Sequence, residues 1–328
     1  MTLGYLARRV AGTLLLLLVL SMAVFALLRL APGNLVSNLL GTRGDTPAAV
    51  AAVRAEYHLD QPLPVQYWHW LSDAVRLRLG TSIRTGEPVS QALGDRLAVT
   101  GELVAYGFVI AVVTGVTGGV VAGLRHRSSL DRGIQGVGLI ALSTPAFAGG
   151  LLLSYVFALM LGWLPAYGPG TGVADRLLHL TLPAVTLGMA VSAVLVKLTR
   201  AAVIRELGQD HVTFARARGV KQRTVLFRYV LRGTLLPVAT GSALVLAYLL
   251  AGTVLVEQVY ALPGLGALLV DSVTYKDLPV VQALALLLAA VICLVNLVTD
   301  LALPWLDPRL AGRSGRGAAR RSAQRRSS

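Results

Sequence analysis

The sequence is poor in the groups on which enzymes usually rely. It has a single cysteine, Cys293, so neither a disulfide within the chain nor a cysteine-based metal site can form. Its five histidines are scattered without an HExxH-type pair, and none of its three lysines follows a GxxxxG phosphate-binding pattern. A Gly-x-Ser-x-Gly nucleophile motif is also absent. We therefore expect a chain that is not an enzyme, with no catalytic residue, no metal site and no bound cofactor of its own.

Charged residues are also scarce, at 14% of the chain against 55% hydrophobic residues. The mean hydropathy is +0.67. Uncharged runs of the roughly 20 residues needed to cross a bilayer recur along the chain, and in hydrocarbon each should be a helix. We predict an all-α polytopic membrane protein with six transmembrane helices, at about residues 10–28, 103–124, 135–161, 177–196, 233–256 and 278–299. The first run also resembles a signal peptide, but its length and the lack of a convincing cleavage site favour a retained helix.

The basic residues are distributed unevenly between the polar segments. With both termini inside, the predicted cytosolic segments hold 21 of the 30 Lys and Arg residues. The positive-inside rule therefore predicts a multi-pass protein of the cell membrane with both termini in the cytoplasm. The net charge of +14 largely reflects this asymmetry, so we do not expect a nucleic-acid partner.

This pattern divides the chain into four predicted segments. Residues 1–30 hold the N-terminus and first helix, and residues 31–101 form an extracytoplasmic helical insertion. Residues 102–306 form a five-helix transmembrane core, and residues 307–328 form a basic, disordered cytoplasmic tail. Pro145 should kink the third span. The glycine repeat of the second span should permit close helix contact, and consists of Gly115, Gly119 and Gly123.

One polar segment, residues 197–232, carries nine Lys and Arg residues against two acids and joins two apolar spans. Its centre combines small side chains with a glycine, which let a backbone approach another surface closely. Membrane spans without central ionisable residues argue against a stand-alone ion-coupled transporter. A helical bundle with a cytosolic docking loop and no energy source of its own suggests a transport subunit that a partner drives.

Several motifs in this order resemble ABC importer permeases of the dipeptide, oligopeptide and nickel family, first-subunit type. The motifs are residues 28–33, 59–67, 162–165, 206–212, 215–219, 231–237, 257–266 and 306–309. The similarity covers nearly all of residues 5–310 and implies the type I ABC importer permease architecture. It also identifies residues 204–232 as the coupling loop, a name kept below.

The resemblance implies roles and partners for this chain. Its coupling residues would be Glu206, Gly208, Asp210, Ala215, Arg216, Ala217, Arg218 and Gly219. The translocation path or gate would involve Pro145, Pro263, Gly264 and Gly266. The partners would be a second homologous permease, two cytosolic ABC ATPases that bind the ATP and Mg, an extracytoplasmic solute-binding protein and the lipid bilayer.

The sequence departs from the family pattern in places. Thr213 and Phe214 replace an acid and an alanine of the more general coupling motif, Gly233 replaces a common asparagine, and Arg78 stands where an acid often precedes Leu-Gly. We expect peptides as cargo. A nickel chelate, glutathione or an oligosaccharide stays open, as do a stand-alone secondary transporter or channel and a membrane scaffold or sensor.

Overall fold

The computed structural model describes residues 3–30, 40, 46–56 and 58–306. The expected disorder of the tail at 307–328, the motif residues 307–309 and part of the insertion at 31–45 lie outside these residues. Apart from one isolated bridge between Thr81 and Pro88, the regular structure of the described part is helical, which confirms the all-α class. The helices are α1 (Leu3–Leu30), α3 (Pro47–Glu56), α4 (Leu63–Val75), α5 (Val89–Leu124), α6 (Ser129–Ser143), α7 (Ala146–Leu153), the π-helical η1 (Ser154–Met160), α8 (Gly172–Leu207), α9 (Asp210–Ala217), α10 (Gln222–Thr224), the π-helical η2 (Val225–Val230), α11 (Leu231–Val259), α12 (Leu265–Thr274) and α13 (Leu278–Leu306).

Five of the expected spans are long apolar helices: α1, α5, α8, α10 to α11, and α13. The third span is a helix pair, α6 and α7 with η1, bent by 107° at its break. The kink expected at Pro145 is thus confirmed, and it divides the span expected at residues 135–161 into two helical parts. Thr144 is extended, as a residue before proline prefers to be, and Pro145 starts the next helix without needing an N–H donor.

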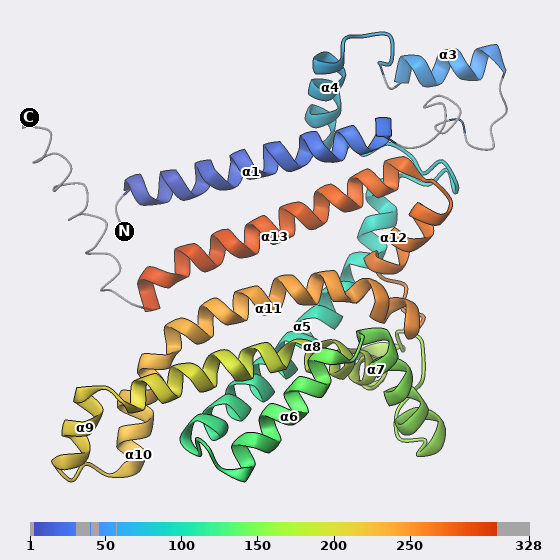
Figure 1. Ribbon diagram of the computed structural model, residues 1–328. Coiled ribbons are helices and arrows are strands. Elements are labelled where there is room, and N and C mark those ends of the chain that lie inside the picture. Colours follow the sequence, from blue (N-terminus) through green and yellow to red (C-terminus); the bar gives the residue numbers. More distant parts are fainter. Residues whose placement is uncertain (1–2, 31–39, 41–45, 57, 307–328) are drawn as a thin grey trace, which may run out of the picture.

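The core of the bundle is the seam between α5 and α8 (Figure 1). The glycine repeat of α5 lies on this seam, as expected. A Cβ added at Gly115 or Gly123 would come within 2.7 Å of Leu195 or Val203, and one at Gly119 within 2.5 Å of Thr199. Because these positions hold only hydrogen, the two backbones approach closely and the neighbouring apolar side chains pack tightly.

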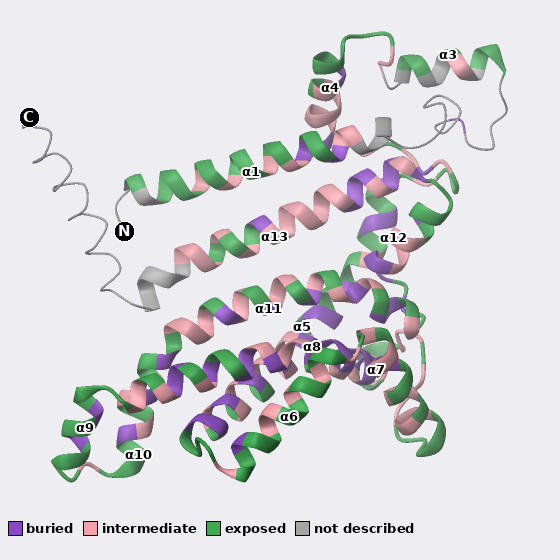
Figure 2. Cartoon of the chain, in the orientation of Figure 1, coloured by how far each residue is buried: buried purple, intermediate pink, exposed green. Residues whose placement is uncertain are grey.

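The helices α1 and α13 lie side by side at one edge of the bundle (Figure 1). Figure 2 shows α1 largely exposed, whereas buried residues line α5, α8 and α12. The exposed residues in the middle of α1 are apolar and include Leu14, Leu15, Val19 and Met22. An apolar face of this kind on a spanning helix suits contact with lipid tails.

Within its described residues the insertion contains the helices α3 and α4. Its predicted end at residue 101 lies well inside α5, which begins at Val89. The Ser82 hydroxyl donates to the Asp277 carboxylate, and the Ile83 N–H donates to the same carboxylate at 3.1 Å. The end of the insertion is thereby tied to the turn before α13.

Candidate functional site

The coupling loop is a small helical unit with its own apolar core. α8 continues to Leu207, the chain turns at Gly208, and α9, α10 and η2 follow before α11. The core of the unit contains Val203, Val212, Ala215, Val225 and Val230, with Leu207, Val220, Leu226 and Tyr229 packed around it. This packing fixes α9 to the end of α8, so a force on α9 is transmitted to a helix of the bundle core.

The expected coupling residues differ in their exposure to solvent. Ala215 is buried, so this small residue packs within the unit and is not on its surface. The exposed residues of the set are Gly208, Asp210, Arg216, Ala217, Arg218 and Gly219. Phe214 stands among them with 68% of its surface exposed. An exposed aromatic beside arginines has the composition of an interface core.

Gly219 follows the C-cap of α9 with φ of +76°. Its N–H donates to the Arg216 carbonyl at 2.9 Å, and Val220 N–H donates to the Ala215 carbonyl at 3.1 Å. These bonds close the helix end with a glycine in the left-handed region, which side chains with a Cβ rarely adopt. A Cβ at Gly219 would meet nothing within 4 Å, so the backbone conformation, not space, requires glycine here.

Glu206 is the only acid of the expected set that is largely shielded from solvent, with 17% of its side chain exposed. Its carboxylate lies directly over Gly233, where an added Cβ would collide with it. The glycine that replaces asparagine at residue 233 therefore leaves room for the Glu206 carboxylate. In this arrangement Glu206 occupies the space that a side chain at Gly233 would need, and it joins the start of α11 to the end of α8.

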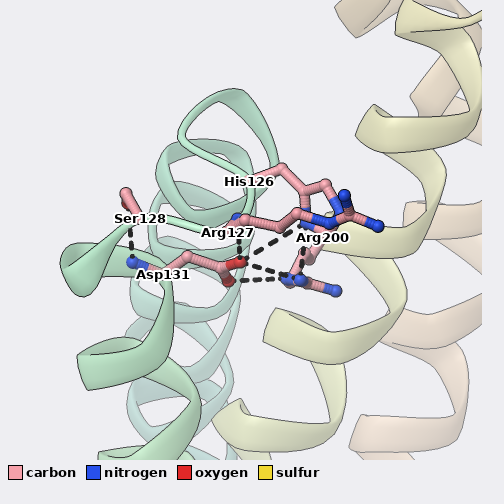
Figure 3. Close-up of polar contacts among 5 residues, drawn as sticks. All are labelled: His126, Arg127, Ser128, Asp131 and Arg200. Atoms are coloured by element: carbon pink, nitrogen blue, oxygen red, sulfur yellow. Dashed lines mark hydrogen bonds and ion pairs between the residues drawn. The ribbon is translucent and has the colours of Figure 1, made fainter.

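An ion pair links α8 to the bent helix pair above the coupling loop (Figure 3). Arg200 Nε donates to Asp131 Oδ1 at 2.6 Å, and Arg200 Nη2 donates to Oδ2 at 2.8 Å. The Arg127 N–H donates to the same carboxylate at 2.9 Å, and the Ser128 hydroxyl oxygen caps α6 by accepting from Asp131 N–H at 3.2 Å. His126 Nδ1 lies 2.9 Å from Arg200 Nη2. Two charge-assisted hydrogen bonds therefore join Arg200 of α8 to Asp131 of α6.

The opposite end of the bundle holds a buried carboxylate that pairs with no cation among the described residues. Glu257, at the end of α11, is fully buried. Its Oε1 accepts from the Thr100 hydroxyl at 2.7 Å, and its Oε2 accepts from Ala267 N–H at 2.9 Å. Leu265 N–H donates to Thr100 Oγ1 at 2.8 Å. Glu257 therefore accepts a hydrogen bond from the first turn of α12 and connects α12 to α5 and α11. A negative group is favoured there because the N-terminus of a helix carries a partial positive charge.

Three of the four residues expected at a gate lie in this arrangement, named here the Glu257 turn (residues 257–266). Gly264 and Gly266 are buried beneath the Glu257 carboxylate, while Pro263 is exposed. A Cβ at Gly264 would collide with that carboxylate, and one at Gly266 would lie 2.5 Å from Val254 Cα. The glycines thus make room for the buried acid. Pro145 is elsewhere, at the break between α6 and α7, where it lines a cavity of about 220 Å³.

Tyr260 connects the Glu257 turn to the bent helix pair. This buried side chain donates its hydroxyl to the Gly150 carbonyl of α7 at 3.1 Å, and the same oxygen lies 2.8 Å from Thr186 Oγ1 of α8. α7, α8 and α11 meet at this hydroxyl. Within the described part of the chain, no group of three or more His, Cys, Asp or Glu residues is arranged to hold a metal ion.

Comparison with known proteins agrees with this arrangement. Residues 115–312 match the family of binding-protein-dependent transport system inner membrane components, and residues 2–104 match the N-terminal segment described for such components. The chain belongs to this family. It is therefore a multi-pass membrane protein and a permease subunit of an ABC importer, as the motifs indicated.

Relatives of this permease match it over nearly its full length. A probable peptide ABC transporter permease of Sinorhizobium fredii is 37% identical over 309 residues, which is 93% of this chain and 98% of the relative. The glutathione transport system permease GsiC of Escherichia coli K12 is 37% identical over 308 residues, 94% of this chain and 99% of the relative. The MetNI methionine ABC transporter in an inward-facing form shares the fold, with a TM-score of 0.55 at 16% identity over 67% of this chain and 98% of that chain.

Three residues with marked interactions were not singled out from the sequence: Asp131, Arg200 and Tyr260. Asp131 carries a local signal, because a serine precedes it by three residues as in a helix cap. Arg200 was counted only among the positive charges of the loop segment, and nothing in the sequence pairs it with a residue 69 positions away. Tyr260 was part of a motif but had no role of its own.

Proposed function

We propose that this permease subunit moves di- or oligopeptides delivered by an extracytoplasmic binding protein. The names of the relatives support a peptide cargo, since the Sinorhizobium relative is called a peptide permease. Glutathione, itself a small peptide, is the second candidate because of the relatives named for glutathione transport. The expectation that the chain binds no cofactor of its own is part of the proposal.

ATP hydrolysis would be supplied by two cytosolic ABC ATPases docked on the coupling loop, with a second homologous permease completing the complex. The observation that carries this proposal is the separate core of the coupling loop, which holds α9 rigidly while it presents Phe214 and two arginines outward. Both termini then face the cytoplasm, in accord with the excess of basic residues in these segments.

A pair of bulky substitutions tests the docking surface. Ala217→Trp adds bulk to the exposed end of α9, and we expect it to lower co-purification of the ATPases and ATP-driven uptake at least about tenfold, because a protruding ring would separate the two surfaces. Ala201→Trp places the same change on an exposed position of α8 outside the coupling loop and should leave both unchanged. Full ATPase binding and uptake in Ala217→Trp, or equal losses in both variants, would contradict docking at α9.

Uptake assays identify the cargo and the transport class. Vesicles containing the complete transporter and its binding protein should accumulate a labelled dipeptide only when ATP is present on the ATPase side. Preference for glutathione over several dipeptides would replace the peptide proposal with the second candidate. Uptake by the permease without ATPases would instead indicate a stand-alone transporter or channel.

A further inference from the structure

A cavity of about 320 Å³ lies at the end of the bundle opposite the coupling loop, between α4 and the adjoining ends of α1 and α13. We name it the distal pocket. Its floor is built from buried residues, among them Gln66, Ala74, Pro279 and Ala283. Phe25 of α1 and Trp70 of α4 form an aromatic wall, with ring centroids 5.7 Å apart. A pocket of this size with an apolar wall suits one small organic group.

Four ionisable side chains line the distal pocket and make no polar side-chain contact with the described residues that would stabilise the fold. They are His58, His69, Asp73 and Arg78. The two imidazoles stack with centroids 4.4 Å apart. Among the described residues, none of the four side chains has a hydrogen-bond or ion-pair partner, although each is within a folded segment. Groups of opposite charge that line one cavity and do not pair with each other remain available to a ligand.

One more polar residue lines the same cavity. Gln282 is buried and lines the pocket, and its side-chain nitrogen donates to the Val24 carbonyl at 3.3 Å. No donor from the described part of the chain reaches its carbonyl oxygen. The pocket therefore offers two acceptors, the Asp73 carboxylate and this oxygen, and a strong donor in Arg78.

A ligand that satisfies all of these groups carries both an anion and an ammonium group. Guanidinium groups bind phosphate and carboxylate, and a carboxylate with a neighbouring carbonyl and aromatic rings binds a primary ammonium. The apolar exposed face of α1 leads from Leu14 and Leu15 through Met22 to Phe25 at the pocket wall. Acyl chains lying along α1 would therefore end at this cavity.

We propose that the distal pocket binds the headgroup of an aminophospholipid. Its phosphate lies at Arg78 and the histidines, and its ammonium lies at Asp73 and Gln282. Arg78 is also a position where this sequence departs from the family pattern, in which an acid is common. An acid at that position would repel the phosphate that an arginine attracts.

The test is a lipid titration of the delipidated transporter complex, followed by native mass spectrometry. Phosphatidylethanolamine should be retained in preference to phosphatidylcholine, whose ammonium donates no hydrogen bond, and to phosphatidylglycerol, which has no ammonium. Asp73→Asn and Arg78→Gln should each weaken phosphatidylethanolamine binding at least about tenfold, as expected for loss of a charged hydrogen-bond partner. The matched control is Arg76→Gln, since Arg76 is exposed on the same segment but does not line the pocket.

Several outcomes would overturn the proposal. Equal retention of the three lipids, unchanged binding in both pocket variants, or an equal loss in Arg76→Gln would each do so. A soluble zwitterion is the other source of the same chemistry. Dialanine or free phosphoethanolamine that binds the delipidated complex as tightly as the lipid does would exclude a lipid-specific site. Thermal unfolding of the lipid-free variants, expected to match the wild type, separates lost binding from lost folding. None of these readouts depends on which cargo is transported.

Discussion

The two ends of this permease hold buried carboxylates that are satisfied in different ways. Near the coupling loop, Asp131 is paired with Arg200, a long side chain from another helix. At the opposite end, Glu257 pairs with no cation from the part of the chain that the structure describes, and it accepts from a hydroxyl and a backbone N–H. The first arrangement depends on charge, and the second depends on fixed backbone geometry with glycines beneath the acid.

This difference indicates which end of the bundle can change its geometry during a transport cycle. An arginine with several rotatable bonds can follow a moving partner and keep its ion pair. Backbone donors at the start of α12 cannot move without α12 itself, and the close contact at Gly264 leaves no free space. We infer a rigid end at the Glu257 turn and a more adaptable end where α6 and α8 meet above the coupling loop.

The largest effect is expected from Glu257→Ala. This change leaves the Thr100 hydroxyl and the Ala267 N–H without their acceptor in a buried place, at a cost of about 3 kcal/mol. The thermal unfolding midpoint in detergent and the membrane yield should both fall clearly. Asp271→Ala removes an exposed acid from the neighbouring α12 and serves as the control. Equal shifts in the two variants would contradict a special role for the buried carboxylate.

A smaller loss is expected from Arg200→Ala. It leaves the shielded Asp131 carboxylate without its cation, but the Arg127 N–H still donates to it and the site is nearer to solvent. The unfolding midpoint should fall by a few degrees, less than in Glu257→Ala. Arg205→Ala, on the same helix and exposed, should not shift it. A larger loss in Arg200→Ala than in Glu257→Ala would reverse the ranking of the two ends.

Sequence reasoning captured the parts of this molecule that depend on composition and local pattern. The uncharged runs predicted the helices, and Pro145 predicted the bend in the third span. The glycine repeat that begins at Gly115 predicted a close contact between helices. The side of a helix on which a residue lies was harder to predict, and Ala215 proved buried because α9 packs on the loop's own core. The pairing of Asp131 with Arg200 depends on how distant helices meet, which no local pattern encodes.

High salt should affect the Asp131–Arg200 ion pair and the Glu257 hydrogen bonds differently. Raising NaCl from 0.1 to 1 M shortens the Debye length from about 10 Å to about 3 Å. Solvent reaches this ion pair through Arg200, with 24% of its side chain exposed, so screening should weaken it more than the hydrogen bonds of the fully buried Glu257. The difference in unfolding midpoint between wild type and Arg200→Ala should therefore shrink at 1 M, because the wild type loses part of its ionic advantage. The difference between wild type and Glu257→Ala should stay the same. A salt-dependent Glu257→Ala difference would show that charge, and not hydrogen bonding, dominates there.

The smallest effect is expected in the middle of the bundle, away from both carboxylates. Cys293 is buried on α13. In Cys293→Ser the new hydroxyl can donate to a carbonyl one turn earlier, as Thr299 does on the same helix at 2.8 Å from the Val295 oxygen. The volume hardly changes and the donor is satisfied, so the cost should stay below about 1 kcal/mol. Uptake and unfolding midpoint should both match the wild type. Loss of uptake at a normal midpoint would reveal a role for the thiol in transport that neither packing nor polarity explains.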